Sequence, residues 1–526
     1  MGEKKSIKIP LLDTIYKNRL LIDLFENSNN LKEFHNGTNL DAIDQNFLAS
    51  RDLSSNKRKI LVNAIKEQYL KADIKIPLNL DKLANNGVFT ITTGHQLCLF
   101  GGPQYFIHKI ISVIVLCEKL KNKFPNHEFI PFFWLASEDH DFKEISSLHI
   151  FNKQIGVEGE DSVAVGKLSP KIFAPVFSEL KQIFKNDERF KYLEKIFSNS
   201  FLKKDLSKFT RYWVSEIFKD EDLIIIDPDD KDLKQLFVPT MNKEIANQFV
   251  FNNVKSTNKK LLSYGYKPKI NPRDLNLFYL SQDKRHRIIY DQNLFHIGDA
   301  VFNKSDLLQN LSENPENFSP NVLLRPLYQE SILPNLIYVG GPSEIAYWTQ
   351  LKESFESSSI NFPILMLRDH FSWLSKKKMD LWLKIGFSEN DLIRSESELN
   401  RKFVEINFDI EFNTTVEKKL LGDLEKSLSN KAELIDSTLV PMVKGMVKGM
   451  NNSLDKSKQK FFQAIKRIQQ EKLSQIQKIN NTVIENGVLK ERKESFIAPY
   501  LQSSSYIRTL KNHSNCEDNS LKVIIY

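Results

Sequence analysis

Five short runs of apolar residues, each ending in a cluster of polar residues, constrain the fold of this 526-residue chain more than any other feature. The runs are continuous rather than alternating, which is typical of strands buried on both faces of a parallel sheet. Helical patterns lie between them, so the sequence predicts an α/β fold in which strands and helices alternate. Ligands of such sheets bind outside the carboxyl ends of the strands, where these polar clusters lie. The runs span residues 88–92, 129–135, 223–226, 336–339 and 364–367.

The first two runs frame a βαβ unit. After residues 88–92, a loop with Gly101-Gly102-Pro103 leads into residues 104–120, whose apolar residues recur every three or four positions. Pro103 lies at the expected first helical position, where proline is favoured. Because the second apolar run follows, the sequence predicts a strand, a glycine-containing loop, a helix and a strand in that order.

Two segments interrupt this alternation. Residues 151–204 and 241–320 do not continue the pattern, and we interpret them as insertions between strands of the core. The second contains short alternating runs at residues 277–280 and 287–290, which predict hairpin strands. In this organisation, core segments occupy residues 1–150, 205–240 and 321–375, a helical hairpin occupies 376–486, and a closing segment, 487–526, packs on the core.

The C-terminal third is predicted to form an antiparallel coiled coil. Apolar residues recur mostly every three to four positions from Val416 to Met446, and again from Leu454 to Val483. We expect two long helices with the turn at residues 451–453. Residues 441–480 hold nine basic and two acidic residues, so they carry +7 of the formal net charge of +8. A solvated face is the simplest interpretation, and a contact with a dimer partner or a polyanion is the alternative.

The composition is that of a soluble globular protein, with 41% hydrophobic and 27% charged residues. The small charge excess excludes a histone-like polycation. Three unpatterned cysteines, Cys98, Cys117 and Cys516, argue against a disulfide framework or a zinc knuckle. The N-terminal residues lack the apolar segment of a signal peptide, and no apolar run approaches the ~20 residues of a membrane span. We therefore expect a cytoplasmic protein with no membrane contact.

The loop after the first run is a candidate anion site. A glycine-containing loop that leads into a helix presents free N–H groups and the positive end of the helix dipole, which suits phosphate or carboxylate. The spacing matches neither a Walker A motif nor Gly-x-Gly-x-x-Gly, so a tight turn that starts a helix is the alternative. The residues concerned are Gly94, His95, Gln96, Gly101, Gly102, His108 and Lys109.

The second apolar run ends in Glu138-Asp139-His140-Asp141, four consecutive ionisable residues. Such side chains at the carboxyl end of a strand could bind a metal ion, position an amine, or act as a general acid or base. Adjacent residues cannot all face one ligand, so we expect two of them to contribute directly. The alternative is a solvated turn that caps a helix.

A third cluster combines Arg325 with polar and aromatic residues. Apolar residues and Pro326 surround Arg325, so its guanidinium is expected to pair with an anion, which is either a ligand group or a buried carboxylate. Tyr347 and Trp348 follow Glu344 at helical spacing and could line a pocket or fill the core. Cys98 lies between leucines and is interpreted as a small core residue rather than a nucleophile.

These motifs together resemble the bacillithiol synthase family, the cysteine ligases of bacillithiol biosynthesis, over essentially the whole chain. The resemblance implies a Rossmann-like core related to nucleotidyltransferases and class I aminoacyl-tRNA synthetases, two connective-peptide insertions, and a helical hairpin used in dimerisation. It also implies a reaction that joins L-cysteine to glucosaminyl-malate. The motifs are Thr93-Gly-His-Gln, Phe133-Trp-Leu-Ala-Ser-Glu-Asp-His-Asp141, Asn321-Val-Leu-Leu-Arg325-Pro and Tyr338-Val-Gly-Gly-Pro-Ser-Glu344-Ile-Ala-Tyr-Trp348.

The implied reaction suggests a role for each cluster. Amide formation from a carboxylate is uphill in water, so our hypothesis is that ATP with Mg²⁺ activates the cysteine carboxylate, with no protein-bound metal required. Catalytic roles then fall to His108, Asp139, His140 and Asp141; nucleotide binding to Gly94, His95, Gln96, Gly101, Gly102 and Lys109; and substrate binding to Asn321, Arg325, Glu344, Tyr347 and Trp348.

Three other classes of function remain open at this stage. A protein of synthetase ancestry could bind RNA through the basic coil, although no second RNA-binding module is recognisable and nucleic acid is not the expected partner. A metal-dependent hydrolase could use His140 and its acidic neighbours, but a spaced set of ligands is missing. A purely structural coiled-coil dimer would leave five polar-tipped strands unexplained.

Overall fold

The computed structural model describes residues 5–11, 16, 18–159, 163–281, 284–407, 414–503 and 505–526. The chain divides into two compact units. The first, here called the core unit, comprises residues 8–371 and 491–522, and the second, the coil unit, comprises residues 1–7, 372–490 and 523–526. Residues far apart in the sequence therefore meet within each unit.

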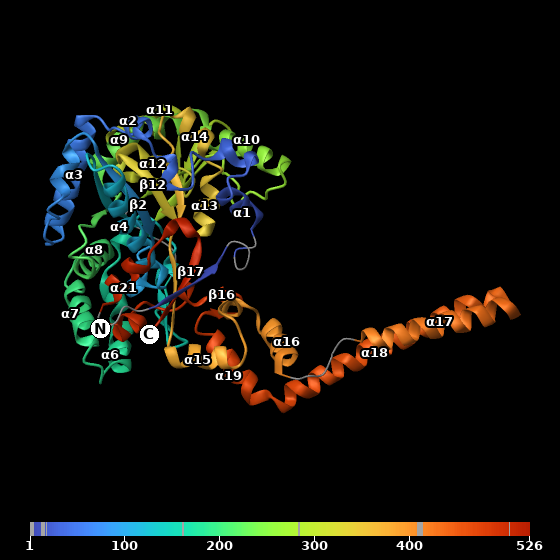
Figure 1. Ribbon diagram of the computed structural model, residues 1–526. Coiled ribbons are helices and arrows are strands. Elements are labelled where there is room, and N and C mark those ends of the chain that lie inside the picture. Colours follow the sequence, from blue (N-terminus) through green and yellow to red (C-terminus); the bar gives the residue numbers. More distant parts are fainter. Residues whose placement is uncertain are drawn as a thin grey trace. The chain divides into compact units, whose positions relative to one another are not determined.

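A five-stranded parallel sheet forms the centre of the core unit (Figure 1). All five apolar runs are strands of this sheet, so the predicted α/β fold is confirmed. The order reverses between the first strand, β2, and the fourth, β12, which is the arrangement of a doubly wound sheet. Across the sheet the strands are β13 (Ile364–Leu367), β12 (Asn335–Gly340), β2 (Val88–His95), β3 (Glu128–Leu135) and β6 (Ile224–Ile226).

Helices cover both faces of the sheet because successive side chains of a strand point to opposite sides. The ring of Phe133 in β3 lies 5.0 Å from that of Phe106 in α4 (Tyr105–Lys123). The next residue, Trp134, lies 5.4 Å from Tyr328 in α12 (Arg325–Ile332) on the other face. Gly94 pairs with Trp134, and a Cβ at position 94 would lie 3.2 Å from the Trp134 carbonyl oxygen. A glycine there keeps β2 and β3 in register at the edge where ligands bind.

Two insertions separate the strands of this sheet. The second insertion contains a five-stranded antiparallel sheet in the order β10-β9-β8-β7-β11, in which β7 and β8 are the expected hairpin strands. Between β3 and β6 lie α5 (Phe142–Ile145), β4 (Ser147–Ile150), β5 (Lys153–Gly156), α6 (Ala174–Ile183), α7 (Phe190–Ser200) and α8 (Leu206–Ile217). Between β6 and α12 lie α9 (Lys231–Asn247), α10 (Phe249–Ser263), β7 (Leu277–Leu280), β8 (Arg285–Asp291), β9 (Leu294–Ile297), β10 (Ala300–Phe302), α11 (Lys304–Glu313) and β11 (Phe318–Pro320).

The N-terminal region begins with a strand, which helices follow. The described helices are short except for α3, and they are α1 (Arg19–Phe25), α2 (Gln45–Ser50) and α3 (Ser55–Lys71). The strand β1 (Ser6–Pro10) belongs to a three-stranded sheet with β17 (Ser520–Ile525) and β14 (His370–Leu374), in the order β1-β17-β14. That sheet joins the two ends of the sequence to its middle.

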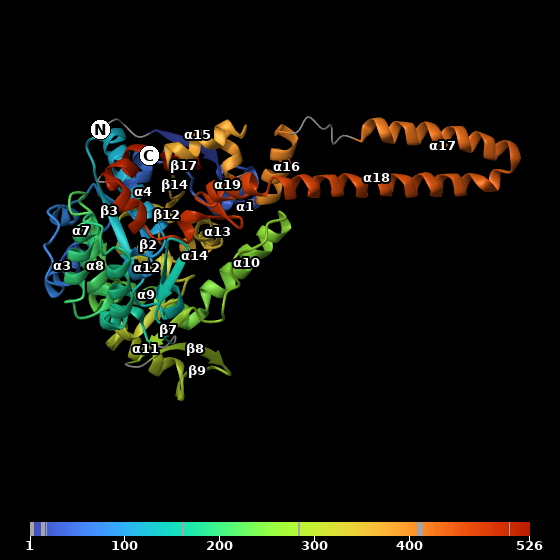
Figure 2. The same cartoon turned by 90° about the horizontal axis from the view of Figure 1, so that it is seen from below.

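The coil unit contains the predicted antiparallel helical hairpin. Helix α17 (Thr415–Ile435) runs alongside α18 (Val440–Ile468) (Figure 2), and Lys418 at the start of α17 forms an ion pair of 2.9 Å with Asp455 in α18. The unit also contains α15 (Lys376–Lys384), α16 (Glu396–Asn407) and α19 (Gln470–Asn480), together with the short strands β15 (Ile484–Glu485) and β16 (Val488–Leu489).

The expected position of the hairpin turn is wrong. The turn lies at residues 436–439, and residues 451–453 continue α18 without a break. Asp436 accepts a hydrogen bond from the Thr438 N–H, and Pro441 lies in the first turn of α18, where its missing N–H has no cost. Proline therefore marks the start of the second helix rather than a weak point of the first. The basic residues of 441–480 all lie after the turn.

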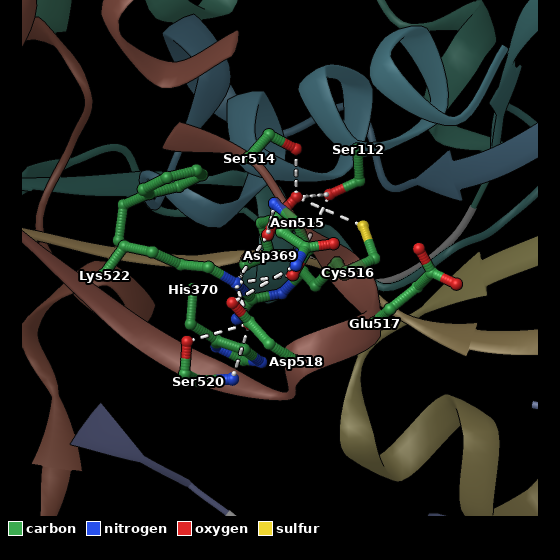
Figure 3. A network of polar contacts seen from close by, with 12 residues as sticks. Ser112, Asp369, His370, Ser514, Asn515, Cys516, Glu517, Asp518, Ser520 and Lys522 are labelled. Atoms are coloured by element: carbon green, nitrogen blue, oxygen red, sulfur yellow. Dashed lines mark hydrogen bonds and ion pairs between the residues drawn. The ribbon is translucent and has the colours of Figure 1, made fainter. Parts of the chain in front are cut away.

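A buried carboxylate, Asp369, fastens the C-terminal segment to the core unit (Figure 3). Its oxygens accept hydrogen bonds from the Lys522 ammonium at 2.8 Å and from the Asn515 N–H at 2.9 Å. The Cys516 thiol also donates, at 3.1 Å, as do the hydroxyls of Ser112 and Ser514. Burial alone would raise the pKa of Asp369, but the Lys522 ammonium reverses this and lowers it to about 2.

Replacing Lys522 should destabilise the core unit strongly. Lys522→Met leaves Asp369 ionised and buried without its ammonium partner, so we expect the free energy of unfolding at pH 7 to fall by about 3–5 kcal/mol. Urea denaturation followed by tryptophan fluorescence measures this change. The matched control is Lys82→Met, which removes the exposed ion pair between Lys82 and Glu128 and should cost about 0–1 kcal/mol.

The same pair predicts how stability depends on pH. The pKa of Asp369 in the folded protein, about 2, is below the ~3.9 of an unfolded aspartate. Its contribution is therefore complete above pH ~4 and is lost as the pH falls towards 2. The Lys522→Met protein should lose much of this acid dependence. A loss of stability equal to that of the Lys82→Met control would contradict this account.

Candidate functional site

A cavity of about 620 Å³ opens at the carboxyl ends of the parallel strands. Each strand is followed by a residue that lines the cavity: Gln96 after β2, Glu138 after β3, Pro228 after β6, Gly341 after β12 and Arg368 after β13. The reversal of strand order between β2 and β12 predicts a ligand site at this edge of the sheet. The cavity is therefore the candidate functional site.

The second insertion and the C-terminal segment supply the rest of the wall. Arg273, Phe278 and Arg285 line the cavity from the insertion, and residues 320–323 line it from the chain that leads into α12. Arg492 lines it from the segment that follows the coil unit. Side chains from distant parts of the sequence thus surround the same volume.

Charged groups of both signs line the cavity, with six cationic and four acidic side chains. A cavity with an excess of two positive charges attracts anionic ligands, and the acidic groups allow it to hold a cationic group as well. The cationic residues are Lys109, Arg273, Arg285, Arg325, Arg368 and Arg492, and the acidic ones are Glu138, Asp139, Glu144 and Glu344.

Lys109 and Glu344 form an ion pair between α4 and α13 (Pro342–Trp348). The ammonium of Lys109 lies 2.5 Å from Glu344 Oε2 and also donates to the Gly94 carbonyl at 2.8 Å. Glu344 accepts further hydrogen bonds from the Tyr338 hydroxyl at 2.7 Å and the Gly341 N–H at 2.8 Å. Burial opposes ionisation of Glu344, but Lys109 outweighs it and lowers the pKa to about 2. Both groups are charged at neutral pH, and each already has a partner.

Arg325 differs because its described hydrogen-bond partners are neutral. Its guanidinium donates to Gln329 Oε1 at 3.1 Å and to the Tyr338 hydroxyl at 3.4 Å, and it lies 5.7 Å from the Tyr338 ring centre. Within the part of the chain that the structure describes, no carboxylate lies within ion-pair distance of it. Of the two alternatives for this arginine, the geometry favours a ligand anion over a buried carboxylate.

Asp139 and His140 meet Arg285 on the other side of the cavity. The Arg285 guanidinium lies 3.4 Å from Asp139 Oδ1 and 3.1 Å from His140 Nδ1, and it is fixed by the Pro320 carbonyl at 3.1 Å. Gln96 also donates to Asp139. Burial raises the proton affinity of Asp139, but hydrogen bonds from His140 and the charge of Arg285 lower its pKa well below the usual range. Asp139 is thus a fixed anion rather than a free base.

His95 lies at the end of β2 between two aromatic rings. Its ring centre is 5.1 Å from that of Tyr105 and 5.2 Å from that of Phe106. Burial, together with the nearby Lys109 ammonium, lowers the pKa of His95 to about 3. The imidazole is therefore neutral at physiological pH and acts as a hydrogen-bonding group rather than a cation.

The predicted site residues divide into two groups by position. The cavity brings together members of all three clusters, because the loops after neighbouring parallel strands share one edge of the sheet. Those that line it are Gly94, His95, Gln96, Lys109, Asp139, His140, Asn321, Arg325, Glu344 and Tyr347. Gly101, Gly102, His108, Asp141 and Trp348 do not line it.

Packing explains the position of the two glycines and Trp348. A Cβ on Gly101 would lie 2.7 Å from the Phe496 ring, and one on Gly102 would lie 2.6 Å from Cys98 Cβ. Both glycines have positive φ, so they form a tight, closely packed turn. Trp348 is fully buried and stacks on Tyr338 with 4.2 Å between ring centres.

His108 and Asp141 bond elsewhere. His108 Nδ1 lies 2.8 Å from Glu491 Oε2, and both side chains are completely buried. Burial lowers the pKa of His108, so it is a neutral donor to Glu491. Asp141 caps α5, where its Oδ1 accepts the Glu144 N–H at 3.0 Å. Cys98 is buried, and burial raises the pKa of its thiol.

Five charged lining residues, Glu144, Arg273, Arg285, Arg368 and Arg492, were not predicted from the sequence. Arg368 directly follows the fifth apolar run, and Glu144 lies three residues after Asp141. The positions of both in the sequence therefore indicated that they could lie near the site. Nothing in the sequence pointed to Arg273, Arg285 or Arg492, because the second insertion and the chain after the coil come close to the site only in the fold.

Metal-ligand clusters and membrane-spanning helices are both absent from the described part of the chain. No group of three or more His, Cys, Asp or Glu side chains in that part of the chain could hold a metal ion. Among the same residues, no helix is both long enough and apolar enough to cross a membrane.

Comparison with known proteins gives matches along nearly the whole chain. The family described as "Bacillithiol biosynthesis BshC, N-terminal Rossmann-like domain" matches residues 7–369, and "Bacillithiol biosynthesis BshC, C-terminal coiled-coil domain" matches residues 373–526. Proteins named "Putative cysteine ligase BshC" are similar to it. The one from Flavobacterium psychrophilum is 34% identical, covering 93% of each chain, and the one from Christiangramia forsetii is 35% identical, covering 89% of each. The one from Cytophaga hutchinsonii is 31% identical, covering 96% of this chain and 95% of its own.

The two matched domains agree with the doubly wound sheet and the helical hairpin, and the identities extend over both. The chain belongs to the bacillithiol biosynthesis BshC family.

Proposed function

We propose that this protein is the ligase that joins L-cysteine to glucosaminyl-malate and so completes bacillithiol. The names of its relatives support a cysteine ligase. The observation that carries the proposal is the Arg325 guanidinium, which has only neutral partners in a cavity with an excess of positive charge. Cysteine has one carboxylate and glucosaminyl-malate has two, so both substrates need cationic partners.

Substrate binding then divides between two sides of the cavity. Arg325 binds a malate carboxylate, and the stacked Tyr338 and the nearby Tyr347 support its guanidinium. Arg368 and Arg492 lie 4.8 Å and 5.9 Å from the Tyr105 ring and offer two further cations. The acidic residues that follow β3 hold the substrate amine. Such fixed charges orient both substrates before reaction.

Activation of the cysteine carboxylate is proposed to use ATP, because amide formation from a free carboxylate is uphill. The positive lining suits a triphosphate, with Gln96, Lys109 and Arg368 in reach of the same volume. A magnesium ion would arrive on the phosphates, which are its usual ligands in such sites. The chain itself supplies charge and orientation.

A stoichiometric assay tests the activation step. Purified protein with cysteine, glucosaminyl-malate and ATP·Mg²⁺ should release one AMP or ADP for each amide formed, as measured by coupled chromatography of nucleotide and thiol. Omission of cysteine should stop product formation. Ligation at full rate without nucleotide would contradict the activation proposal, and absence of ligation with nucleotide would contradict the ligase proposal.

Removing the Arg325 charge should weaken substrate binding. Arg325→Gln keeps a hydrogen-bonding side chain but loses the cation, so we expect kcat/KM for glucosaminyl-malate to fall about 10- to 100-fold, in line with the loss of one charged hydrogen bond. KM for ATP should change little. Arg189→Gln, on an exposed side chain outside the cavity, is the matched control. Equal kinetics for the two variants would contradict the role of Arg325.

The hairpin is proposed to form a homodimer interface. Val416, Leu420 and Leu424 recur at every fourth position of α17 and are all exposed, and Met442, Met446 and Met450 do the same on α18. A stripe of apolar residues at this spacing is typical of a helix that packs against another helix. A second copy of the hairpin provides a surface of the same chemistry.

Charges placed in this stripe should separate the copies. For Leu420→Lys combined with Met446→Lys, we expect the sedimentation coefficient to fall from that of a dimer to that of a monomer, because both changes place charges in the apolar stripe. The solvated faces of the two helices are unchanged. Lys426→Glu, a charge change on an exposed residue on the opposite side of α17, serves as the control. A wild-type protein that sediments as a monomer at micromolar concentration would contradict the dimer.

A further inference from the structure

Glu144 is unlike the other acidic residues of the cavity because its carboxyl group has no hydrogen-bond or ion-pair partner among the residues that the structure describes. Glu138 pairs with Lys234 at 2.8 Å, Glu344 pairs with Lys109 at 2.5 Å, and Asp139 binds Arg285 and Gln96. Among the described residues, no hydrogen bond or ion pair involves the Glu144 carboxyl oxygens, although they line the same volume. Glu144 is therefore the acid of this cavity that is free to exchange a proton with a ligand.

The backbone around Glu144 is nevertheless fixed. Glu144 lies in α5, whose start is capped by the Asp141 carboxylate through the Glu144 N–H at 3.0 Å. Its carbonyl oxygen lies 3.8 Å from the buried Cys98 thiol. Phe142, the first residue of the helix, is buried and stacks with Phe173 at 6.2 Å between ring centres. The carboxyl group thus extends into the cavity from a packed base.

The groups that face Glu144 raise its proton affinity. Glu144 is an exposed residue of the cavity wall, yet partial loss of solvation is the largest influence on its carboxyl group, and the neighbouring carboxylates of Asp141 and Asp139 add to it, so the pKa of Glu144 rises to about 7. From α4, Lys109 acts in the opposite direction, and from α13, Glu344 raises the pKa slightly further. Tyr105 and Cys98 are further titratable neighbours, and burial keeps both uncharged at neutral pH. A base that titrates near the working pH transfers protons most efficiently.

We propose that Glu144 is the general base that takes a proton from the substrate amine as the amide bond forms. This inference rests on the ligase function proposed above. The acidic residues after β3 line the same cavity as the arginines, so the cavity can hold the amino group near Glu144 together with the carboxylates and phosphates. Asp139, held ionised by Arg285, contributes charge rather than proton transfer.

The substrate ammonium loses one proton to solvent on binding and is then an amine. Its lone pair forms the C–N bond to the nucleotide-activated acyl carbon of cysteine, an acyl phosphate or acyl adenylate. The second proton passes from nitrogen to the Glu144 carboxylate. The C–O bond to the leaving group breaks, and the phosphate or AMP departs with the electron pair. Glu144 then releases its proton to water.

The test compares Glu144→Gln with wild type and with Glu158→Gln, the same change on an exposed acid outside the cavity. We expect kcat for amide formation to fall about 100-fold in Glu144→Gln. The rise of wild-type kcat with pH near 7 should disappear as well. Activation should be unchanged: with hydroxylamine, an uncharged nucleophile at pH 7, replacing the amino sugar, cysteine hydroxamate should form at the wild-type rate.

The outcomes separate the two proposals. If wild type forms amide but Glu144→Gln keeps its kcat within threefold and its pH profile, Glu144 is not the base and the ligase function stands. If hydroxamate formation falls as far as amide formation, Glu144 acts in activation or binding and the base role is overturned. If wild type forms neither amide nor hydroxamate, the ligase function itself fails and the base role with it.

Discussion

Two buried carboxylates hold the C-terminal segment against the end of β13, and the cavity depends on them. Asp369 binds Lys522, and the adjacent Arg368 donates to Glu491 at 2.7 Å. Glu491 also accepts from His108, from His370 and from the Phe371 N–H. Burial would raise the pKa of Glu491, but the charge of Arg368 lowers it well below its ordinary value. Breaking one partner of such a pair leaves an uncompensated charge, so both ends of the segment stay docked.

The docking of the C-terminal segment also positions side chains of the cavity. Arg368 lines the cavity and is nearly inaccessible to solvent, so Glu491 sets the direction of its guanidinium. The next residue, Arg492, lines the same cavity. A chain segment that returns after the coil unit therefore completes the positive side of a site whose other residues precede that unit in the sequence. His108, expected from its sequence neighbours to face a nucleotide, instead faces Glu491.

The sequence predicts those features of the fold and the site that depend on residues close together in the chain, and it does not predict contacts between distant residues. The five strands were predictable because burial on both faces leaves a local apolar signature, and the chain order of their polar ends locates the site. Glu344 and Arg325 were found for the same reason. Arg285 was not, because nothing near it in the sequence indicates that an inserted strand reaches Asp139. The hairpin turn was misplaced because the residue types of Asn451-Asn452-Ser453 favour a turn locally, whereas Pro441 is compatible with a helix start.

Glu344 and Glu144 show how the fold assigns different tasks to one residue type. Lys109 lowers the pKa of Glu344 to about 2, while partial loss of solvation and two aspartates raise that of Glu144 to about 7. The difference comes from position: Glu344 lies within reach of the ammonium that β2 and α4 hold in place, and Glu144 lies beyond it, among carboxylates. Divergent pKa values within one site separate fixed charges from groups that exchange protons. In an amide ligase the fixed charges orient the acyl donor, and a group such as Glu144 can accept the proton that the amine must lose.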